Sequence, residues 1–330
     1  MVAAVKQGSD VDSTNQRGAV LGLAHHLRDA LRRVDRAGLR RHDAAGLVVA
    51  GMGGSAIGGR LARAVLGARE RRPIVLVSGY DLPTWVDTRW TVLLSSYSGS
   101  TEETLACWEA ATRRRARRIV ASTGGALAAL AGEAGVPIIT LPTGFQPRAA
   151  VGYATVTALE VAAACGCAPS LRGEIEAAAL ATEDPPDAEP VAELLRDGIP
   201  LIVGAELTAP VAYRWKGQIN ENANRPAFSS ELPEHDHNEI EGWAAPLVPV
   251  FLADRETHPR TLRRIQVTAD LTARAGLRPV VVPTGPGERA ERLFRLVLLG
   301  DLLSIVLAVG AGTDPVSIPA IDHLKAAMAR

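Results

Sequence analysis

The chain has 330 residues, of which 47% are hydrophobic and 22% are charged, and its 36 basic and 36 acidic residues leave no formal net charge. This length accommodates two α/β domains with cores of their own, and the composition is that of an ordinary globular protein. The balanced charge disfavours nucleic-acid binding, because proteins that neutralise phosphates usually carry a basic excess. Three cysteines, Cys107, Cys165 and Cys167, are too few for a disulfide framework.

Membrane and secretory segments are not expected. The apolar runs, such as 47–49 and 201–203, are far shorter than the roughly 20 residues that a membrane span requires. The N-terminus turns polar after Val5 and lacks the apolar centre of a secretory signal. We therefore expect a cytoplasmic protein that binds neither membranes nor nucleic acids.

The first half of the chain alternates between short apolar runs and stretches of helical periodicity. A long amphipathic helix is predicted over 16–41, followed by a buried strand at 47–50 and a helix that ends at Leu66. Further elements are predicted as strands at 74–77, 91–95, 118–122 and 137–141, and as helices at 102–115, 125–134, 150–165 and 171–181. Such alternation is typical of βαβ units that form a parallel sheet.

A polar segment with two prolines, 182–187, is the best linker candidate. After it the alternation resumes, with strands at 201–203, 247–252 and 279–282, and helices at 208–222, 258–275, 288–309 and 315–329. The fold class is therefore α/β, with two doubly wound domains, each a parallel sheet flanked by helices. The expected divisions are an N-terminal helical segment at 1–43, a first domain at 44–165, a helical connection with the linker at 166–198, and a second domain with a C-terminal helix at 199–330.

Lysine and asparagine are rare in this chain. There are three lysines, Lys6, Lys216 and Lys325, and five asparagines, of which four lie in the 19 residues from 220 to 238. The richness in Arg, Ala, Gly and Val indicates a coding bias against both residue types. Residues that persist in a cluster despite such a bias are favoured as chemically required.

The first candidate motif is Gly51-Met52-Gly53-Gly54-Ser55-Ala56, which follows the predicted strand 47–50. Glycines on a strand-to-helix turn let the backbone approach a ligand, and the helix N-terminus favours anions. The motif partly fits a dinucleotide-binding fingerprint, although Asp81 comes late for a ribose-binding acid. The absence of Gly-Lys-Ser/Thr excludes a P-loop, and a tight turn without a ligand is the alternative.

A second loop, 95–103, follows the strand 91–95 and is rich in hydroxyl groups. Ser100 and Glu103 have the spacing of a capping box, so part of this pattern is explained by the start of a helix. A cap needs one hydroxyl, whereas this loop offers Ser95, Ser96, Ser98, Ser100 and Thr101. Two neighbouring parallel strands that both end in such loops favour the binding of a phosphate monoester.

The densest polar cluster extends from Lys216 to Trp243 and includes 220–222 and 234–239. Three interpretations are open from the residues alone. His235 and His237 with nearby carboxylates could bind zinc, although no third ligand is clearly placed. The segment could be an exposed polar loop, or it could supply a carboxylate and an imidazole for acid–base catalysis next to a bound sugar.

The two loops resemble the signature loops of the sugar isomerase (SIS) domain. The segments 220–223 and 234–243, which read Asn-Glu-Asn-Ala and Glu-His-Asp-His-Asn-Glu-Ile-Glu-Gly-Trp, resemble the bifunctional phosphoglucose/phosphomannose isomerases of archaea and bacteria. SIS loops are shared with regulators and aminosugar enzymes, whereas the second pair of segments is much more selective. The resemblance spans nearly the whole chain and implies two SIS-type domains.

The resemblance also implies roles for individual residues. The phosphate-binding set would be Gly54, Ser55, Ser96, Ser98, Ser100 and Thr101. Glu221 matches the catalytic base, and Arg148 matches an arginine near the enediolate. His237 matches a ring-opening histidine that related isomerases receive from the neighbouring subunit, so a homodimer is expected. Lys325 matches a C-terminal lysine near the ring oxygen.

These residue types suit aldose–ketose isomerisation of a sugar phosphate. One carboxylate can move a proton between C1 and C2 through a cis-enediolate, and a nearby cation stabilises the oxyanion. No metal or redox cofactor is required. The resemblance implies a small hydroxyl residue shortly before Lys325 in members that act on mannose 6-phosphate, and no residue of 315–319 can be assigned to it. Glucose 6-phosphate is therefore the firmer expected substrate and mannose 6-phosphate the less firm one.

Two rival functions remain. A non-catalytic phosphosugar sensor would need the loops but not Glu221, His237 and Lys325 together. A nicotinamide oxidoreductase would use the turn at 51–56 as a Rossmann fingerprint, but the serine-rich second loop has no place in that scheme.

Overall fold

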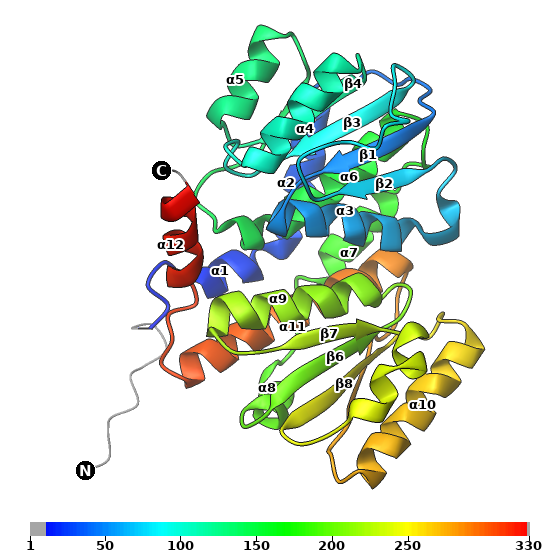
Figure 1. Ribbon diagram of the computed structural model, residues 1–330, viewed down its shortest axis with the longest axis vertical. Coiled ribbons are helices and arrows are strands. Elements are labelled where there is room, and N and C mark those ends of the chain that lie inside the picture. Colours follow the sequence, from blue (N-terminus) through cyan, green and yellow to red (C-terminus); the bar gives the residue numbers. More distant parts are fainter. Residues whose placement is uncertain (1–10, 329–330) are drawn as a thin grey trace. The chain divides into compact units, whose positions relative to one another are not determined.

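A computed structural model describes residues 11–328, which form two compact units (Figure 1). The β1–β5 unit comprises Gly22–Glu183 with Glu288–Glu291. The β6–β9 unit comprises the segment up to Leu21, Asp184–Gly287 and the chain from Arg292 onward. The two doubly wound α/β folds expected from the sequence are confirmed, while the expected domain limits remain a prediction.

The β1–β5 unit is built on five parallel strands in the order β2-β1-β3-β4-β5. Their bounds are Gly46–Ala50 for β1, Ile74–Val77 for β2, Trp90–Ser95 for β3, Arg117–Ser122 for β4 and Ile138–Thr140 for β5. All residues of β1 and β3 are buried, because helices cover both faces of the sheet. This explains why their sequences are apolar without alternation.

Helices flank this sheet on its two faces (Figure 1). One face carries α2 (Leu23–Arg36), α3 (Gly53–Leu66), α6 (Val151–Ala164) and α7 (Arg172–Ala181), with the 3-10 helices η2 (Gly67–Arg69) and η3 (Pro147–Ala150). The other face carries α4 (Glu102–Arg113) and α5 (Gly125–Glu133). The helix predicted over 16–41 is instead two helices, α1 (Gln16–Leu21) and α2, because the chain breaks at Gly22 and leaves the helix after Arg36.

The β6–β9 unit has four parallel strands in the order β7-β6-β8-β9. Their bounds are Ile199–Gly204 for β6, Phe228–Glu231 for β7, Leu247–Ala253 for β8 and Val280–Pro283 for β9. The helices are α8 (Glu189–Leu195), α9 (Ala209–Ala223), α10 (Pro259–Arg274), α11 (Arg289–Gly310) and α12 (Pro319–Met328), with η4 (Glu234–His237) and η5 (Glu239–Gly242).

Helix α11 corrects one expectation from the sequence. Within residues 11–328, it alone has the length and apolar composition of a membrane span, although the apolar runs suggested that the chain has no such segment. Arg295 and Asp301 interrupt its apolar runs, so a search for uninterrupted apolar runs in the sequence did not identify this helix. Of its most apolar window, 72% is buried in the structure, as in the core helix of a globular protein.

Candidate active site

The glycine-rich loop lies where β1 passes into α3, at the point where the strand order of the first sheet reverses between β1 and β3. Open α/β sheets bind ligands at this carboxyl edge. Gly53 adopts a φ of 50°, and the cap residue Met52 contributes no side-chain hydrogen bond to the helix. The first turn of α3 therefore presents backbone N–H groups that no Ser, Thr or Asp cap covers, as an anion-binding helix start requires.

The serine-rich loop joins β3 to α4 and is held by its own hydroxyl groups. Ser96 Oγ lies 2.8 Å from Thr101 Oγ1 and accepts the N–H of Gly99 at 3.0 Å. The N–H of Ser100 donates to Ser98 Oγ at 3.2 Å. Ser96 is buried beneath the loop, whereas Ser98 and Ser100 are exposed. The loop therefore presents its outer hydroxyls in a conformation that Ser96 fixes from below.

The predicted capping box of Ser100 and Glu103 does not form. Helix α4 begins at Glu102 with Thr101 as its cap residue, and no side chain caps it. The hydroxyl of Thr101 faces Ser96 instead of the helix N–H groups. The capping prediction was wrong because the loop's hydroxyls bond within the loop.

Gly99 brings the serine-rich loop against the next loop of the sheet. Its φ is 69°, and a Cβ atom at this position would lie 1.8 Å from the carbonyl oxygen of Gly124. Tyr97, which the sequence analysis did not single out, accepts the N–H of Phe145 at 3.0 Å through its hydroxyl oxygen. The only sequence feature that pointed to this contact was the position of Tyr97 within the serine-rich loop. Tyr97 thus joins the loop to the segment that leads into η3.

Arg148 lies in η3 and is 4% exposed. Gly54 allows this placement, because a Cβ atom on Gly54 would lie 2.7 Å from Pro147 O and 3.3 Å from Arg148 Cα. The backbone of Arg148 therefore packs directly against the first turn of α3. The structure thus gathers the predicted phosphate-binding residues and Arg148 at one edge of one unit.

In contrast, the carboxyl edge of the second sheet is filled by the protein's own side chains. At the β6–β8 switch point, Thr208 Oγ1 donates to Leu252 O at 2.9 Å and accepts the N–H of Ala205. Beside it, the buried Arg292 donates to Asp254 at 2.7 Å, and Thr284 donates to the same carboxylate. A phosphate would have to displace these groups, so the β1–β5 unit offers the better candidate for phosphate binding.

Glu221 lies half-buried in the last turn of α9, in the β6–β9 unit. Helix α9 follows β6 and packs back along β6 and β7, so its C-terminus reaches the amino edge of this sheet. Buried polar side chains along α9 contact α11. Glu221 therefore lies at the end of a helix whose buried face is hydrogen-bonded to α11.

The two histidines of the third cluster differ in environment. His235 is 1% exposed, and its Nδ1 lies 3.1 Å from Ser230 Oγ and 3.2 Å from Glu239 Oε2. Its ring packs on Trp243 with 5.4 Å between centroids. His237, two residues later, is exposed at the end of η4. His235 is therefore a core residue, and His237 is the histidine available to a ligand.

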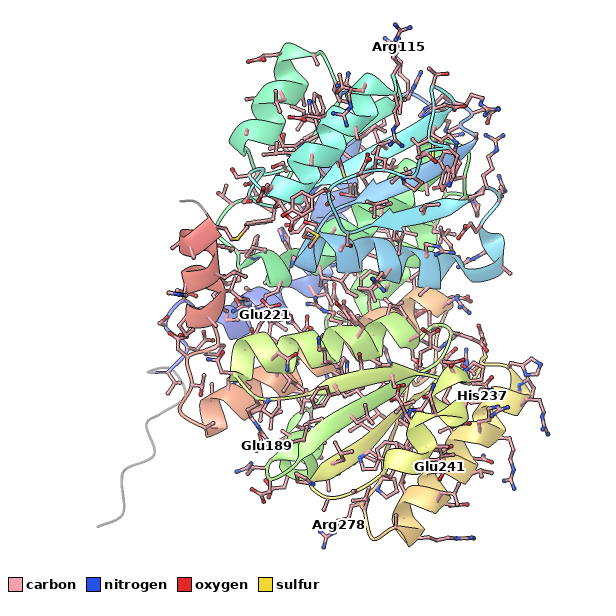
Figure 2. The ribbon with its side chains drawn as sticks, viewed as in Figure 1. Arg115, Glu189, Glu221, His237, Glu241 and Arg278 are labelled. Atoms are coloured by element: carbon pink, nitrogen blue, oxygen red, sulfur yellow. The ribbon has the colours of Figure 1, made fainter. Side chains whose placement is uncertain are left out.

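Glu221 and His237 of one chain stand apart (Figure 2). Glu221 is at the amino edge of the β6–β9 sheet, whereas His237 follows β7 at the carboxyl edge. The figure shows them at opposite ends of this unit. The structure therefore does not bring together the base and the ring-opening histidine expected from the sequence.

Lys325 lies on α12, all of whose residues are exposed. The segment before α12 is tied to the end of α9, because Asn224 Nδ2 donates to Ser317 O at 3.3 Å. This contact connects the turn that carries Glu221 with the segment that leads to Lys325.

The structure also bears on the metal interpretation. Among residues 11–328, no group of three or more His, Cys, Asp or Glu side chains has the arrangement of a metal site. His235 is instead engaged by Ser230 and Glu239. His235 is therefore buried while His237 is exposed, and their spacing in the sequence does not make them joint ligands of a metal ion.

Known proteins resemble this chain over most of its length. A family model described as the bacterial phospho-glucose isomerase C-terminal SIS domain matches residues 185–328. A bifunctional phosphoglucose/phosphomannose isomerase from Caldicellulosiruptor bescii is 35% identical over 297 residues, which are 84% of this chain and 88% of the relative. One of the same description from Aquifex aeolicus is 33% identical over 289 residues, 84% of this chain and 88% of the relative.

A solved structure supports the fold. A hypothetical protein from Thermus thermophilus superimposes with a TM-score of 0.73 over 95% of this chain and 90% of its own, with 17% sequence identity. At this identity the likeness concerns the fold alone.

Proposed function

The chain belongs to the family of bifunctional phosphoglucose/phosphomannose isomerases, and on this basis we propose that it interconverts glucose 6-phosphate and mannose 6-phosphate with fructose 6-phosphate. The observation that carries the proposal is the pair of loops at the β1–β3 switch point, combined with 35% identity across 84% of the chain. We expect such an enzyme to act in the cytoplasm, in carbohydrate metabolism, where it would serve glycolysis or gluconeogenesis.

The phosphate would bind at the first turns of α3 and α4. The backbone N–H of Gly54, the hydroxyl of Ser55 and the outer hydroxyls of Ser98 and Ser100 would offer donors to its oxygens, and Thr101 would contribute beside Ser96, which its hydroxyl contacts. Ser96 would act from beneath by fixing the loop. This arrangement supports recognition of a phosphate monoester without a metal ion.

Isomerisation then requires one base, one cation and a route for ring opening. Glu221 would take the proton from C2 of the aldose and return it to C1, while the reverse reaction moves it from C1 to C2. The buried guanidinium of Arg148 would stabilise the enediolate oxygen. Ring opening moves a proton from the O1 hydroxyl to the ring oxygen, a task that suits His237 and Lys325.

The separation of Glu221 and His237 within one chain supports a shared site. His237, at the carboxyl edge of the β6–β9 sheet, lies at the opposite end of this unit from its own Glu221 at the amino edge. A two-fold homodimer would supply His237 of the partner subunit to each site. His237 is exposed, as a residue directed to a partner must be in the single chain.

A coupled assay tests the function. Purified protein should convert both aldose phosphates to fructose 6-phosphate. Glu221→Gln retains the side chain's shape but removes its basicity, so turnover should fall at least about 100-fold. Glu189→Gln, which changes an exposed carboxylate on α8 of the same unit, should leave turnover unchanged.

The same assay separates the rival functions. A phosphosugar sensor would bind fructose 6-phosphate without turnover in the wild type. An oxidoreductase would bind NAD or NADP, which the proposed enzyme should not. Turnover that survives in Glu221→Gln would remove Glu221 from the mechanism.

A further inference from the structure

Three asparagines surround Glu221, and each fixes a different part of the chain. Asn220 Nδ2 donates to Arg225 O at 2.8 Å and so holds the loop that follows α9. Asn224 ends the helix in the left-handed conformation, with φ 50° and ψ 36°, and donates to Ser317 O. Asn222 points into the core and is 0% exposed. The scarce asparagines thus cluster at the turn that carries Glu221.

The contact of Asn222 continues into α11. Asn222 Nδ2 donates to Ser304 Oγ at 2.8 Å, and Ser304 Oγ donates in turn to Asp301 O at 2.7 Å. Ser304 is also 0% exposed. Because the serine hydroxyl has one proton, this direction of bonding satisfies both residues at once. A buried pair of this kind loses a full hydrogen bond when either partner is removed.

Nearer the N-terminus of α9, further buried side chains bind α11. Arg214 Nε and Nη2 bind the Asp301 carboxylate at 2.9 and 2.6 Å, and both side chains are almost fully buried. Trp215 Nε1 donates to Leu296 O at 2.8 Å. Positions 214, 218 and 222 form one stripe at helical spacing, all buried against α11. The stripe extends to the residue next to Glu221.

We propose that Asn222 and Ser304 are positioning residues for Glu221, which rests on Glu221 being the base of the proposed function. The last turn of a helix frays, because its carbonyl groups have no partner within the helix. A catalytic carboxylate tolerates little of this motion, since a displacement of about 1 Å can cost about 100-fold in rate. The Asn222–Ser304 bond holds that turn to α11, and Asn220 and Asn224 hold the chain that follows it.

Ser304→Ala tests the proposal, with Trp215→Phe as the matched control. Each variant removes one hydrogen bond between α9 and α11, but Trp215 lies six residues before Glu221, outside the last turn of α9. Ser304→Ala should lower kcat about 10-fold with KM changed less than about twofold, because the phosphate loops lie on other elements. Amide hydrogen exchange should rise in the last turn of α9. Trp215→Phe should leave kcat within about twofold of wild type.

Further variants separate this proposal from the proposed function. In a Glu221→Gln background, Ser304→Ala should change the residual turnover less than about twofold, because no carboxylate remains to be misplaced. If Glu221→Gln is inactive while Ser304→Ala keeps full kcat, the positioning role is overturned and the base role stands. Equal loss of kcat in Trp215→Phe would also overturn it, since general loosening would then explain both. Full turnover in Glu221→Gln would overturn the base role and the positioning role together.

Discussion

Gly54 approaches Pro147 so closely that a Cβ atom on the glycine would lie 2.7 Å from the proline carbonyl oxygen. This contact joins the glycine-rich loop to η3, the 3-10 helix that carries Arg148. Both partners are backbone, so neither can rotate away to make room. The position of the proposed phosphate-binding turn therefore depends on the position of η3, and a shift of either segment would also move the other.

Gly54→Ala should disturb the contact between the glycine-rich loop and η3. The added methyl group must displace η3 or the first turn of α3, so kcat/KM should fall at least about 10-fold. Gly132→Ala in α5 is the control, because a Cβ there meets nothing within 4 Å. It should retain activity and raise thermal stability slightly, since alanine favours the helix by about 0.5–1 kcal/mol. Similar activity in both variants would contradict the packing argument.

Ser98→Ala combined with Thr101→Ala should raise KM far more than it lowers kcat. Contacts with the phosphate are made equally in the ground state and the transition state, so their loss weakens binding without slowing the chemistry. Steady-state kinetics with glucose 6-phosphate measures both constants, and Ser170→Ala, an exposed serine remote from the loop, is the control.

Inorganic phosphate or sulfate should compete with the substrate in the wild-type protein and less well in this double variant. If neither anion competes in the wild type, the serine-rich loop is only the start of a helix.

Mixing two inactive variants should test the shared site. After subunit exchange, a Glu221→Gln chain and a His237→Ala chain form heterodimers in which one site has both residues intact and the other has neither. An equal mixture should recover about a quarter of wild-type activity if exchange is random. Glu221→Gln exchanged with itself is the control and should stay inactive. A fully active monomer in light scattering would exclude the arrangement.

Acidification should destabilise the fold through His26. The ring is 3% exposed between Phe145 and Tyr153, and burial, with a smaller effect of the His25 charge, lowers its pKa from 6.5 to about 4. The unfolded chain therefore binds a proton at this residue where the folded chain does not. The free energy of unfolding should fall as the pH drops from 6.5 towards 4, by up to about 3 kcal/mol.

Unfolding measured by urea at several pH values checks this expectation. His26→Phe should flatten the dependence in this window, because it keeps the ring packing and loses the titration. His323→Gln, an exposed histidine on α12, should keep the wild-type slope. An unchanged slope in His26→Phe would assign the acid sensitivity to other groups.

Most of the fold follows from the sequence, because the buried strands are short apolar runs that alternate with stretches of helical periodicity. The strand β7 was missed because its Phe-Ser-Ser-Glu sequence lies at a sheet edge and is largely polar. The helix α8 was missed because it is seven residues long and begins with a proline at its second position.

The site was predictable in its residue types but not in its arrangement. His235 and His237 have similar sequence surroundings, and only the packing on Trp243 shows that His235 belongs to the core. The hydroxyls of the serine-rich loop suggested a capping box, because sequence spacing cannot show that Thr101 bonds Ser96. Ser304 carries no motif at all, since its contact with Asn222 joins residues 82 positions apart.

The closed carboxyl edge of the β6–β9 sheet has a consequence for stoichiometry. Two sheets of similar plan would suggest two equivalents of anion per chain in a titration. Because Thr208 and the ion pair of Arg292 with Asp254 already occupy the second edge, calorimetry should saturate at a single equivalent. The β6–β9 unit would then bind no anion at its carboxyl edge. Its contribution to the site would be Glu221, which lies at its amino edge on the last turn of α9.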